Sequence, residues 1–128
     1  MIEVVAGVLV SHGRLLVAKR RDGGSRGGVW EFPGGKVEAG ESHAHALSRE
    51  LSEELDVLVY VEDEVACVEH TYEDCAIRLT MYRCRVRAGG PRPIEHAELN
   101  WVRVGELSTI AFDAADARCI EAVVQAFS

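Results

Sequence analysis

The sequence predicts a single domain of the α/β (α+β) class, in which helices flank a mixed sheet. The chain has 128 residues, a length that fits one hydrophobic core. Hydrophobic residues make up 48% of it and charged residues 27%, as in globular proteins. Short β-branched runs and two helical patterns follow one another in the order β-β-α-β-β-β-β-α, with no internal repeat. That order fits helices packed on the two faces of one mixed sheet over residues 1–128.

The first part of the chain predicts a hairpin followed by a glycine-rich loop. Residues 2–10 and 15–19 are β-branched and aliphatic runs, and the turn pattern Ser11-His12-Gly13 separates them. The first of these strands is apolar enough to be buried on both faces. Four glycines among residues 22–28 then predict a mobile loop, which has the spacing of neither a P-loop nor a dinucleotide-binding turn.

The rest of the chain predicts two helices and four strands. Apolar residues recur at three- and four-residue steps through residues 42–55, which predicts a helix packed on the core. They are Ala44, Leu47, Leu51 and Leu55. A second helix is expected at residues 113–127, with Asp113 as its N-cap. Its buried side is predicted to contain Ala117, Ile120, Val124 and Phe127. Strands are predicted at 57–61, 65–70, 77–86 and 99–104.

The charge and cysteine patterns exclude several classes of protein. Lys and Arg number 14 against 21 Asp and Glu, so the formal net charge is −7, which disfavours binding to a nucleic-acid backbone. No apolar run approaches the roughly 18 residues of a membrane span, and no basic region precedes the apolar start as in a signal peptide. The four cysteines lack CxxC or other zinc-ligand spacing. We therefore expect a reduced cytoplasmic protein whose partners include neither a membrane nor a nucleic-acid polymer.

Three glutamates share one flank of the first predicted helix. Glu53 and Glu54 follow Glu50 by three and four positions, which places their Cβ atoms about 6 Å from that of Glu50. Carboxylates at that spacing repel one another, and a bound cation relieves the repulsion. Oxygen ligands at this density suit Mg²⁺ or Mn²⁺ better than zinc. A solvated acidic helix face is the alternative interpretation of these three residues taken alone.

The residues around these glutamates favour the metal site, because together they resemble the Nudix box. That motif has a glycine, a glutamate and an Arg-Glu-aliphatic-x-Glu-Glu run at fixed intervals. The matching residues here are Gly35, Glu41, Arg49, Glu50, Leu51, Glu53, Glu54 and Val57. The resemblance implies a Nudix-type α/β/α sandwich in which Gly35, Glu50, Glu53 and Glu54 bind divalent metal. Asp56 stands where the motif has glycine, and aspartate tolerates the left-handed conformation expected after a helix.

Other residues of the motif have a physical reason as well. Arg49 can hold a neighbouring carboxylate through two hydrogen bonds at once. The turn Pro33-Gly34-Gly35 lets the backbone approach a phosphate or a metal that a side chain would keep away. In the family that the box resembles, the metals neutralise phosphate oxygens and activate a water for attack on phosphorus.

Residues outside the box resemble the MutT-like branch of the same family. The matching segments are Ile2–Gly7 and Trp30–Lys36. The resemblance implies conversion of nucleoside triphosphates to monophosphates and pyrophosphate, with a late acidic residue as a further metal ligand or a base. Glu95 is the best positional match for that residue, and Glu98 is the second. It stays open whether Glu53, Glu54 or Glu95 deprotonates the water.

The resemblance also predicts where the nucleotide binds. Arg20 and Lys36 are expected to contact phosphates, and Phe32 to contact the base. Asp116, near the start of the C-terminal helix, is expected to read the hydrogen-bonding edge of the base. An ionised aspartate only accepts hydrogen bonds, which suits an exocyclic amino group. The alternative role for Asp116 is that of an acid favoured at a helix N-terminus. The five histidines are expected to have no function, and His96 to be isolated at a turn or strand end.

The predicted function is that of a Mg²⁺-dependent nucleoside triphosphate pyrophosphohydrolase, with Mn²⁺ as a second candidate ion. Its expected substrate is 8-oxo-dGTP or another modified nucleotide. A (d)CTP or 5-methyl-dCTP pyrophosphohydrolase is an alternative that Asp116 favours. A nucleotide-binding Nudix module without turnover is a further alternative, although all the glutamates of the box are present. A monomer or a homodimer is expected.

Overall fold

The computed structural model describes residues 1–24 and 26–128, so Ser25 of the predicted glycine-rich loop lies outside the described residues. The strands are β1 (Ile2–Ser11), β2 (Arg14–Lys19), β3 (Trp30–Glu31), β4 (Gly34–Lys36), β5 (Leu58–Thr71), β6 (Ala76–Ala88) and β7 (Glu98–Arg103). The helices are α1 (His43–Leu55), the 3₁₀ helix η1 (Val104–Thr109), α2 (Ala114–Ala117) and α3 (Ile120–Phe127). Within the described residues, every helix is too short or too polar to cross a membrane.

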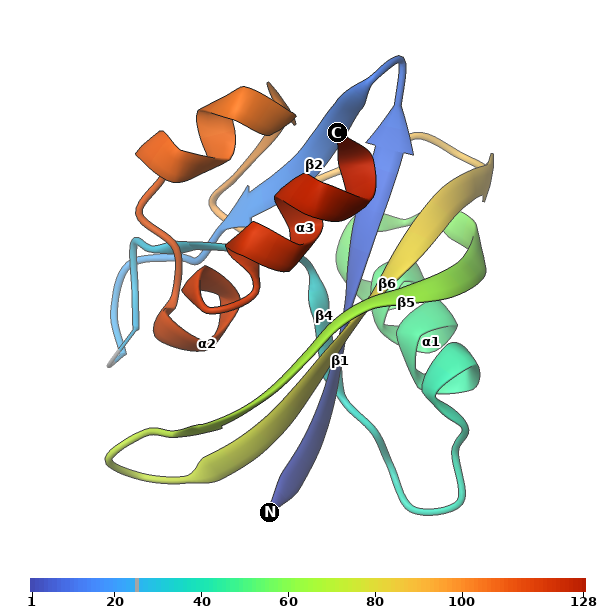
Figure 1. Ribbon diagram of the computed structural model, residues 1–128. Coiled ribbons are helices and arrows are strands. Elements are labelled where there is room, and N and C mark those ends of the chain that lie inside the picture. The colour runs from blue at the N-terminus through green and yellow to red at the C-terminus, as the bar shows by residue number, and fades with distance from the viewer. Residues whose placement is uncertain (25) are drawn as a thin grey trace.

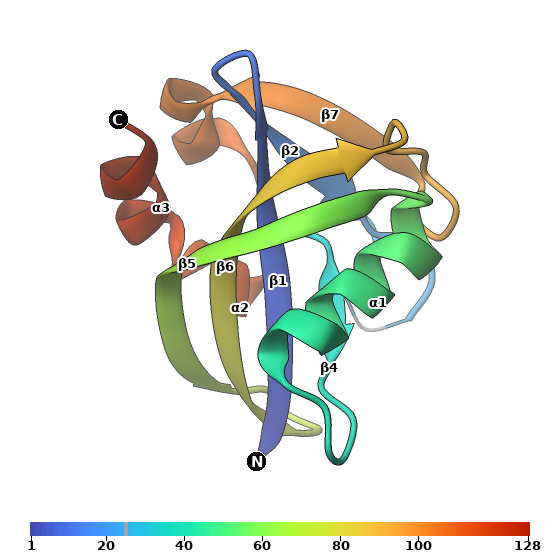
Figure 2. The same ribbon diagram turned by 90° about the vertical axis from the view of Figure 1, so that its right-hand side faces the viewer.

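Strand β1 is the centre of a mixed sheet. It pairs in parallel with β6 and in antiparallel fashion with β2 and β4. Strand β5 pairs with β6, and β3 and β7 both pair with β2. Helix α1 covers one face of the sheet, whereas α2 and α3 lie over the other (Figures 1 and 2). The predicted fold class is therefore confirmed.

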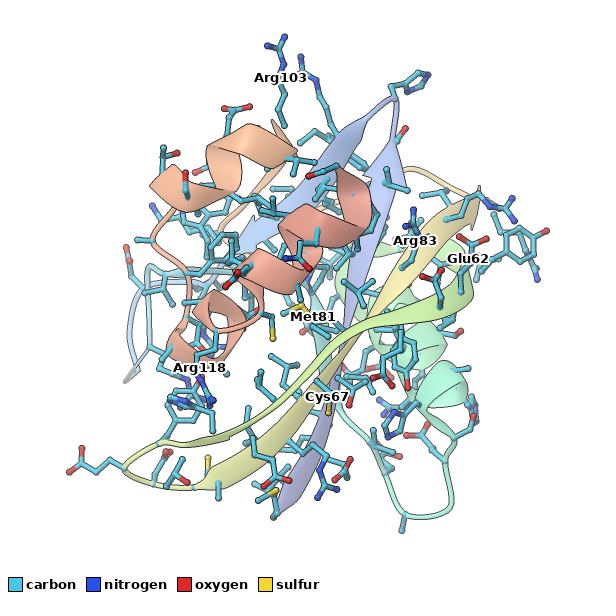
Figure 3. The ribbon with its side chains drawn as sticks, viewed as in Figure 1. Glu62, Cys67, Met81, Arg83, Arg103 and Arg118 are labelled. Carbon is cyan, nitrogen blue, oxygen red and sulfur yellow. The ribbon has the colours of Figure 1, made fainter. Side chains whose placement is uncertain are left out.

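The pleat of β1 explains why both of its faces are buried, because successive side chains point to opposite sides. Ala6 and Val8 belong to the core on the side of α2 and α3, while Val5 and Leu9 belong to the core on the side of α1. All four are at most 2% exposed, as the apolar run predicts. On the α3 side, the buried Met81 of β6 points toward the helix (Figure 3) and joins the same cluster as Val123.

The ends of α1 follow the sequence closely. Ser42 caps the first turn, because its Oγ accepts a hydrogen bond from the backbone N–H of His45 at 3.1 Å. Asp56 ends the helix in the left-handed conformation, with φ of 55° and ψ of 47°. The expected conformation of the residue that replaces glycine is therefore confirmed.

The buried stripe of α1 is confirmed except for its first member. Leu47, Leu51 and Leu55 are completely buried. Ala44 is exposed, whereas Ala46 is buried. Helical spacing fixes only the direction of a side chain, and none of residues 43–45 in the first turn is buried.

Two of the predicted strands are parts of one strand. The sequence predicts separate strands at 57–61 and 65–70, but β5 is continuous from Leu58 to Thr71. Its pairing with β6 shifts register between Val61 and Glu64 and again between Glu64 and Ala66. Such bulges insert residues without ending a strand, so the acidic interruption of the apolar pattern is not a turn.

The predicted helix at 113–127 is wrong in its continuity, because α2 and α3 are separated at Arg118 and Cys119. The break leaves Ala117 exposed and buries Cys119 and Val123, while Ile120, Val124 and Phe127 are partly buried against the core. Asp113 is the N-cap residue of α2, but its carboxylate makes no capping hydrogen bond. The sequence also gave no signal for β4 or η1.

We expect Asp56→Ala to lower the free energy of unfolding by about 1 kcal/mol, because alanine tolerates the left-handed conformation less well than aspartate. Asp56→Gly should be as stable as the wild type or more stable, because glycine adopts this conformation without a steric penalty. Both variants lose the exposed ion pair with Arg92 at 2.7 Å, so their difference reports the backbone alone. Urea denaturation measures it, and equal stability of the two variants would contradict this explanation.

Candidate active site

Two adjoining cavities lie beside β4, with volumes of about 650 and 430 Å³. Residues of α1 and of the chain just before β7 line only the larger one, which we call the acidic cavity. Its charged lining residues and one histidine are Arg20, Arg21, Asp22, Glu31, Lys36, Glu38, Glu50, Glu54, Glu95 and His96. The smaller cavity, which we call the apolar-walled cavity because apolar side chains of β1 and β6 line one part of it, is also lined by Phe32 and by several charged residues that include Asp116.

The structure brings together most of the residues that the sequence singles out. Six of them line the acidic cavity: Arg20, Gly35, Lys36, Glu50, Glu54 and Glu95. Phe32 and Asp116 line the apolar-walled cavity. Arg20, Gly35 and Lys36 line both, so they mark the boundary between the two. In the described part of the chain, Arg49 and Glu53 line neither cavity.

Arg49 connects helix α1 to the loop that precedes it. Its Nε and Nη2 donate to the two carboxylate oxygens of Glu41 at 2.8 and 2.9 Å, and its Nη1 donates to Glu50 at 2.9 Å. Nη2 also donates to the backbone oxygen of Lys36 at 3.1 Å. The hydrogen bonds from Arg49 lower the pKa of Glu41 to about 2. Arg49 therefore has the expected bidentate geometry toward Glu41, and it orients Glu50 from outside the cavity through a single hydrogen bond.

Glu54 is the most strongly perturbed carboxyl group of the acidic cavity. It is 4% exposed although it ends the polar flank of α1. Burial, followed by the neighbouring Glu50 and by the charges of Glu31 and Glu95, raises the pKa of Glu54 to about 10. Without a cation this carboxyl group keeps a proton at neutral pH. Glu53, in contrast, is about half exposed and lies 3.6 Å from Nη1 of Arg49.

Gly35 makes room for the carboxylate of Glu50. A Cβ atom at this position would overlap the carboxyl group of Glu50. Any side chain would therefore displace Glu50 from the wall of the cavity. The sequence predicts that the backbone at this glycine lies close to a ligand. In the structure the backbone at Gly35 also lies close to the carboxylate of Glu50 in α1.

Glu31 and His96 lie in the acidic cavity, although neither was predicted as a site residue. Nε2 of His96 lies 2.9 Å from Oε2 of Glu31 and 3.7 Å from Oε1 of Glu54. The other oxygen of Glu31 accepts from Nη1 of Arg20 at 2.9 Å. The ligand atoms of Glu31, Glu54 and His96 lie within 4.8 Å of one another, a group that could hold a metal ion. The expectation of an isolated His96 is therefore wrong, and only its position next to Glu95 could have indicated this.

Phe32 and Asp116 are joined by a hydrogen bond beside the apolar-walled cavity. The backbone N–H of Phe32 donates to Oδ2 of Asp116 at 2.9 Å, and the ring of Phe32 stacks on that of Phe112 with centroids 5.4 Å apart. Asp116 is 6% exposed, and burial raises its pKa well above the ordinary value. The sequence argument treats Asp116 as an ionised acceptor. The structure instead favours a neutral carboxyl group, which can donate one hydrogen bond as well as accept.

Comparison with known proteins identifies the family. The model of the NUDIX domain matches residues 4–122. The chain belongs to the NUDIX family.

A Mycobacterium tuberculosis (strain H37Rv) relative, provisionally named 8-oxo-dGTP diphosphatase 2, is 39% identical over 88% of this chain and 81% of its own length. The Escherichia coli K12 protein named CTP pyrophosphohydrolase is 36% identical over 95% of this chain and 90% of its own length. The solution structure of the E. coli ORF135 protein has a TM-score of 0.86 at 35% identity, with 98% of this chain and 89% of that chain covered.

This Nudix chain is a hydrolase, and Nudix hydrolases generally need a divalent metal. The residues around the acidic cavity fit such an ion on their own chemistry. Carboxylates converge there, burial and negative neighbours raise the pKa of Glu54, and Gly35 leaves room for Glu50. The identity of the ion and the role of each residue belong to the proposal that follows.

The proton on Glu54 predicts how stability depends on pH in EDTA. Since folding raises the pKa of Glu54 to about 10, the folded state is favoured below about pH 4 and loses this advantage as the pH rises toward 10. Glu54→Gln should therefore melt at a higher temperature than the wild type in EDTA, by a margin that grows from pH 5 to pH 9. Added Mg²⁺ should stabilise the wild type more than the variant. A pH-independent difference in Tm would contradict the buried proton.

Proposed function

We propose that this chain is a Mg²⁺-dependent nucleoside triphosphate pyrophosphohydrolase that releases a nucleoside monophosphate and pyrophosphate. The relation of the two cavities is the observation that supports this most directly. The acidic cavity offers carboxylates for a cation, and the apolar-walled cavity offers Phe32 and Asp116 for a base. The cationic side chains of Arg20 and Lys36 lie where the two meet. A triphosphate joined to a nucleobase has this same division into a charged and a flat part.

Residues of the acidic cavity would hold the ion and the phosphates. Glu50, Glu54 and the backbone of Gly35 are the proposed ligands in the cavity wall, Glu53 is a further proposed ligand outside that wall, and Glu95 in the wall is a ligand or the base. When bound, the ion neutralises phosphate oxygens and lowers the pKa of a water. Arg49 keeps Glu50 in position through its hydrogen bond at 2.9 Å. Arg20 and Lys36 would contact phosphate oxygens.

The attacking water needs a general base, and the surroundings of Glu95 favour this residue for that role. Glu95 is exposed, lines the acidic cavity, and makes no ion pair with any residue that the structure describes. Glu54 holds its own proton unless a cation replaces it, so it is better suited as a ligand. The attack would take place at the β-phosphorus and would break its bond to the oxygen that bridges the α- and β-phosphates, so the nucleoside monophosphate leaves while the proton of the water passes to Glu95.

The hydrogen-bonding groups of Asp116 are compatible with two nucleobases. A neutral carboxyl group donates and accepts side by side, which matches O6 and N1–H of a guanine as well as N3 and N4–H₂ of a cytosine. We propose 8-oxo-dGTP as the substrate, in keeping with the name of the M. tuberculosis relative. The second candidate is (d)CTP or 5-methyl-dCTP, which the name of the E. coli relative favours.

The cytoplasm is the compartment that this proposal implies, since nucleoside triphosphates are substrates there. All four cysteines are free thiols, as is usual in a reducing compartment. The proposed enzyme acts as a monomer or a homodimer on a free nucleotide.

The reaction is tested by measuring pyrophosphate release from 8-oxo-dGTP with Mg²⁺. Glu53→Gln, Glu54→Gln and Glu95→Gln should each lower kcat by roughly 10²–10⁴-fold, the range for a lost acid or base group. Loss of the general base should lower kcat without weakening Mn²⁺ binding, whereas loss of a metal ligand should also weaken Mn²⁺ binding. Glu121→Gln on the exposed side of α3 is the matched control. Near-normal turnover of Glu53→Gln would remove Glu53 from the site. Tight nucleotide binding by the wild type without pyrophosphate release would instead support a binding module.

Base preference is tested by the ratio of kcat/KM for 8-oxo-dGTP to that for dCTP. Asp116→Asn keeps a donor and an acceptor but fixes which atom donates, so the ratio should change by about 10-fold or more, or roughly 1.4 kcal/mol. Asp63→Asn, an exposed aspartate on β5, is the control and should leave the ratio unchanged. An unchanged ratio in Asp116→Asn would discard Asp116 as the residue that reads the base.

A further inference from the structure

His96 is the buried side chain on which several parts of the acidic cavity converge. It is 6% exposed and lies in the segment between β6 and β7. Its Nε2 faces Glu31 of β3 at 2.9 Å and Glu54 of α1 at 3.7 Å. Three segments that are far apart in the sequence therefore meet at one imidazole.

The other ring nitrogen decides which tautomer is present. Nδ1 of His96 is buried and has no hydrogen-bond partner among the described residues. A proton on Nδ1 would leave a buried donor without an acceptor, whereas a proton on Nε2 meets the carboxylate of Glu31. The geometry therefore favours the tautomer that carries its proton on Nε2. In this tautomer Nε2 is a donor, so it has no lone pair for a metal.

The bond from Nε2 completes the set of donors to Glu31. Oε1 of Glu31 accepts from Arg20 at 2.9 Å, and Oε2 accepts from His96. One donor follows β2 and the other precedes β7, so Glu31 is fixed from both sides. Its burial and the two donors keep the carboxylate turned toward Glu54.

Hydrogen bonds also hold the backbone of residues 94–97, the segment that contains His96. Arg21 donates from Nε to the backbone oxygen of Glu95 at 2.7 Å and from Nη2 to that of Ile94 at 3.2 Å. The N–H of Ala97 donates to the backbone oxygen of Lys19 at 2.9 Å. Arg21 holds this segment from the solvent side, and His96 holds it from the inside. Between them they hold the backbone of Glu95.

We propose that His96 is a positioning residue, which through its Nε2–H bond to Glu31 places Glu95 and the Glu31–Glu54 pair around the ion. This rests on the proposed metal-dependent hydrolysis, but metal binding tests it separately. Outer hydrogen-bond partners of this kind are typically worth 10- to 100-fold in metal affinity or activity. The role of His96 is then to organise ligands, with no contact to the substrate.

The test compares variants that keep or remove the donor. His96→Gln can present an amide N–H near the place of Nε2, whereas His96→Leu fills the space without a donor. Mn²⁺ titration of the nucleotide-free protein, followed by electron paramagnetic resonance, should show 10- to 100-fold weaker binding for His96→Leu and less than 5-fold for His96→Gln. With nucleotide and saturating Mg²⁺, kcat should fall in the same order while KM changes less than 3-fold. His12→Asn, in the exposed β1–β2 turn, is the control.

Two outcomes would overturn the proposal. One is Mn²⁺ binding and kcat of His96→Leu equal to those of the wild type. The other is equal impairment of His96→Gln and His96→Leu, which would make the imidazole itself a ligand. If His96→Leu does not fold, His96→Asn replaces it, because its amide is too short to reach Glu31. A long-range ¹H–¹⁵N spectrum of the wild type should show the Nε2–H tautomer, and the Nδ1–H tautomer would contradict the assignment. Absence of pyrophosphate release with normal Mn²⁺ binding would refute the proposed reaction and leave the role of His96 standing.

Discussion

Repulsion among acidic side chains at one end of α1 is the constraint on which the site depends. Glu50, Glu54, Glu31 and Glu95 meet in one cavity, and more than half of the net charge of −7 comes from residues 36–56. The fold compensates with donors placed outside the carboxylates: Arg49 on Glu50, and Arg20 with His96 on Glu31. Among the residues that the structure describes, none donates such a bond to Glu54, so burial raises its pKa and favours its protonated form. The compensation is therefore incomplete in the protein alone, and a divalent cation would complete it.

The sheet makes this crowding possible because β1 supports both faces. Its antiparallel pairing with β4 places Gly35 beside Val5, and Val5 is packed in the core beneath α1. The backbone of β4 is thereby held close to Glu50 of that helix. A Cβ atom at Gly35 would overlap the carboxyl group of Glu50, and one at Gly34 would overlap the backbone of Val5. A rigid sheet edge would thus fix one side of the proposed ion site, while α1 would supply ligands.

Local patterns predicted the elements and the box well, because spacing along one helix or strand determines which side chains share a face. The leucine stripe of α1 and the conformation of Asp56 are properties of this kind. The division of the C-terminal helix and the continuity of β5 depend on tertiary packing, which no local pattern contains. His96 and Glu31 are 65 positions apart, and their contact exists only because β3 and β7 both pair with β2. The sequence could show the two residues, but not their bond.

Glu31 lines both cavities, and this links the two halves of the site. On one side it faces Glu54, and on the other its neighbour Phe32 bonds to Asp116. Its ionised form is maintained by Arg20 and His96, which together lower its pKa in spite of its burial. Asp116 has no cationic side chain bonded to it among the described residues, so the same burial favours its neutral form. The pKa values of these two neighbouring acids are thus shifted in opposite directions, which favours an ionised carboxylate beside the proposed ion and a neutral carboxyl group beside the proposed base.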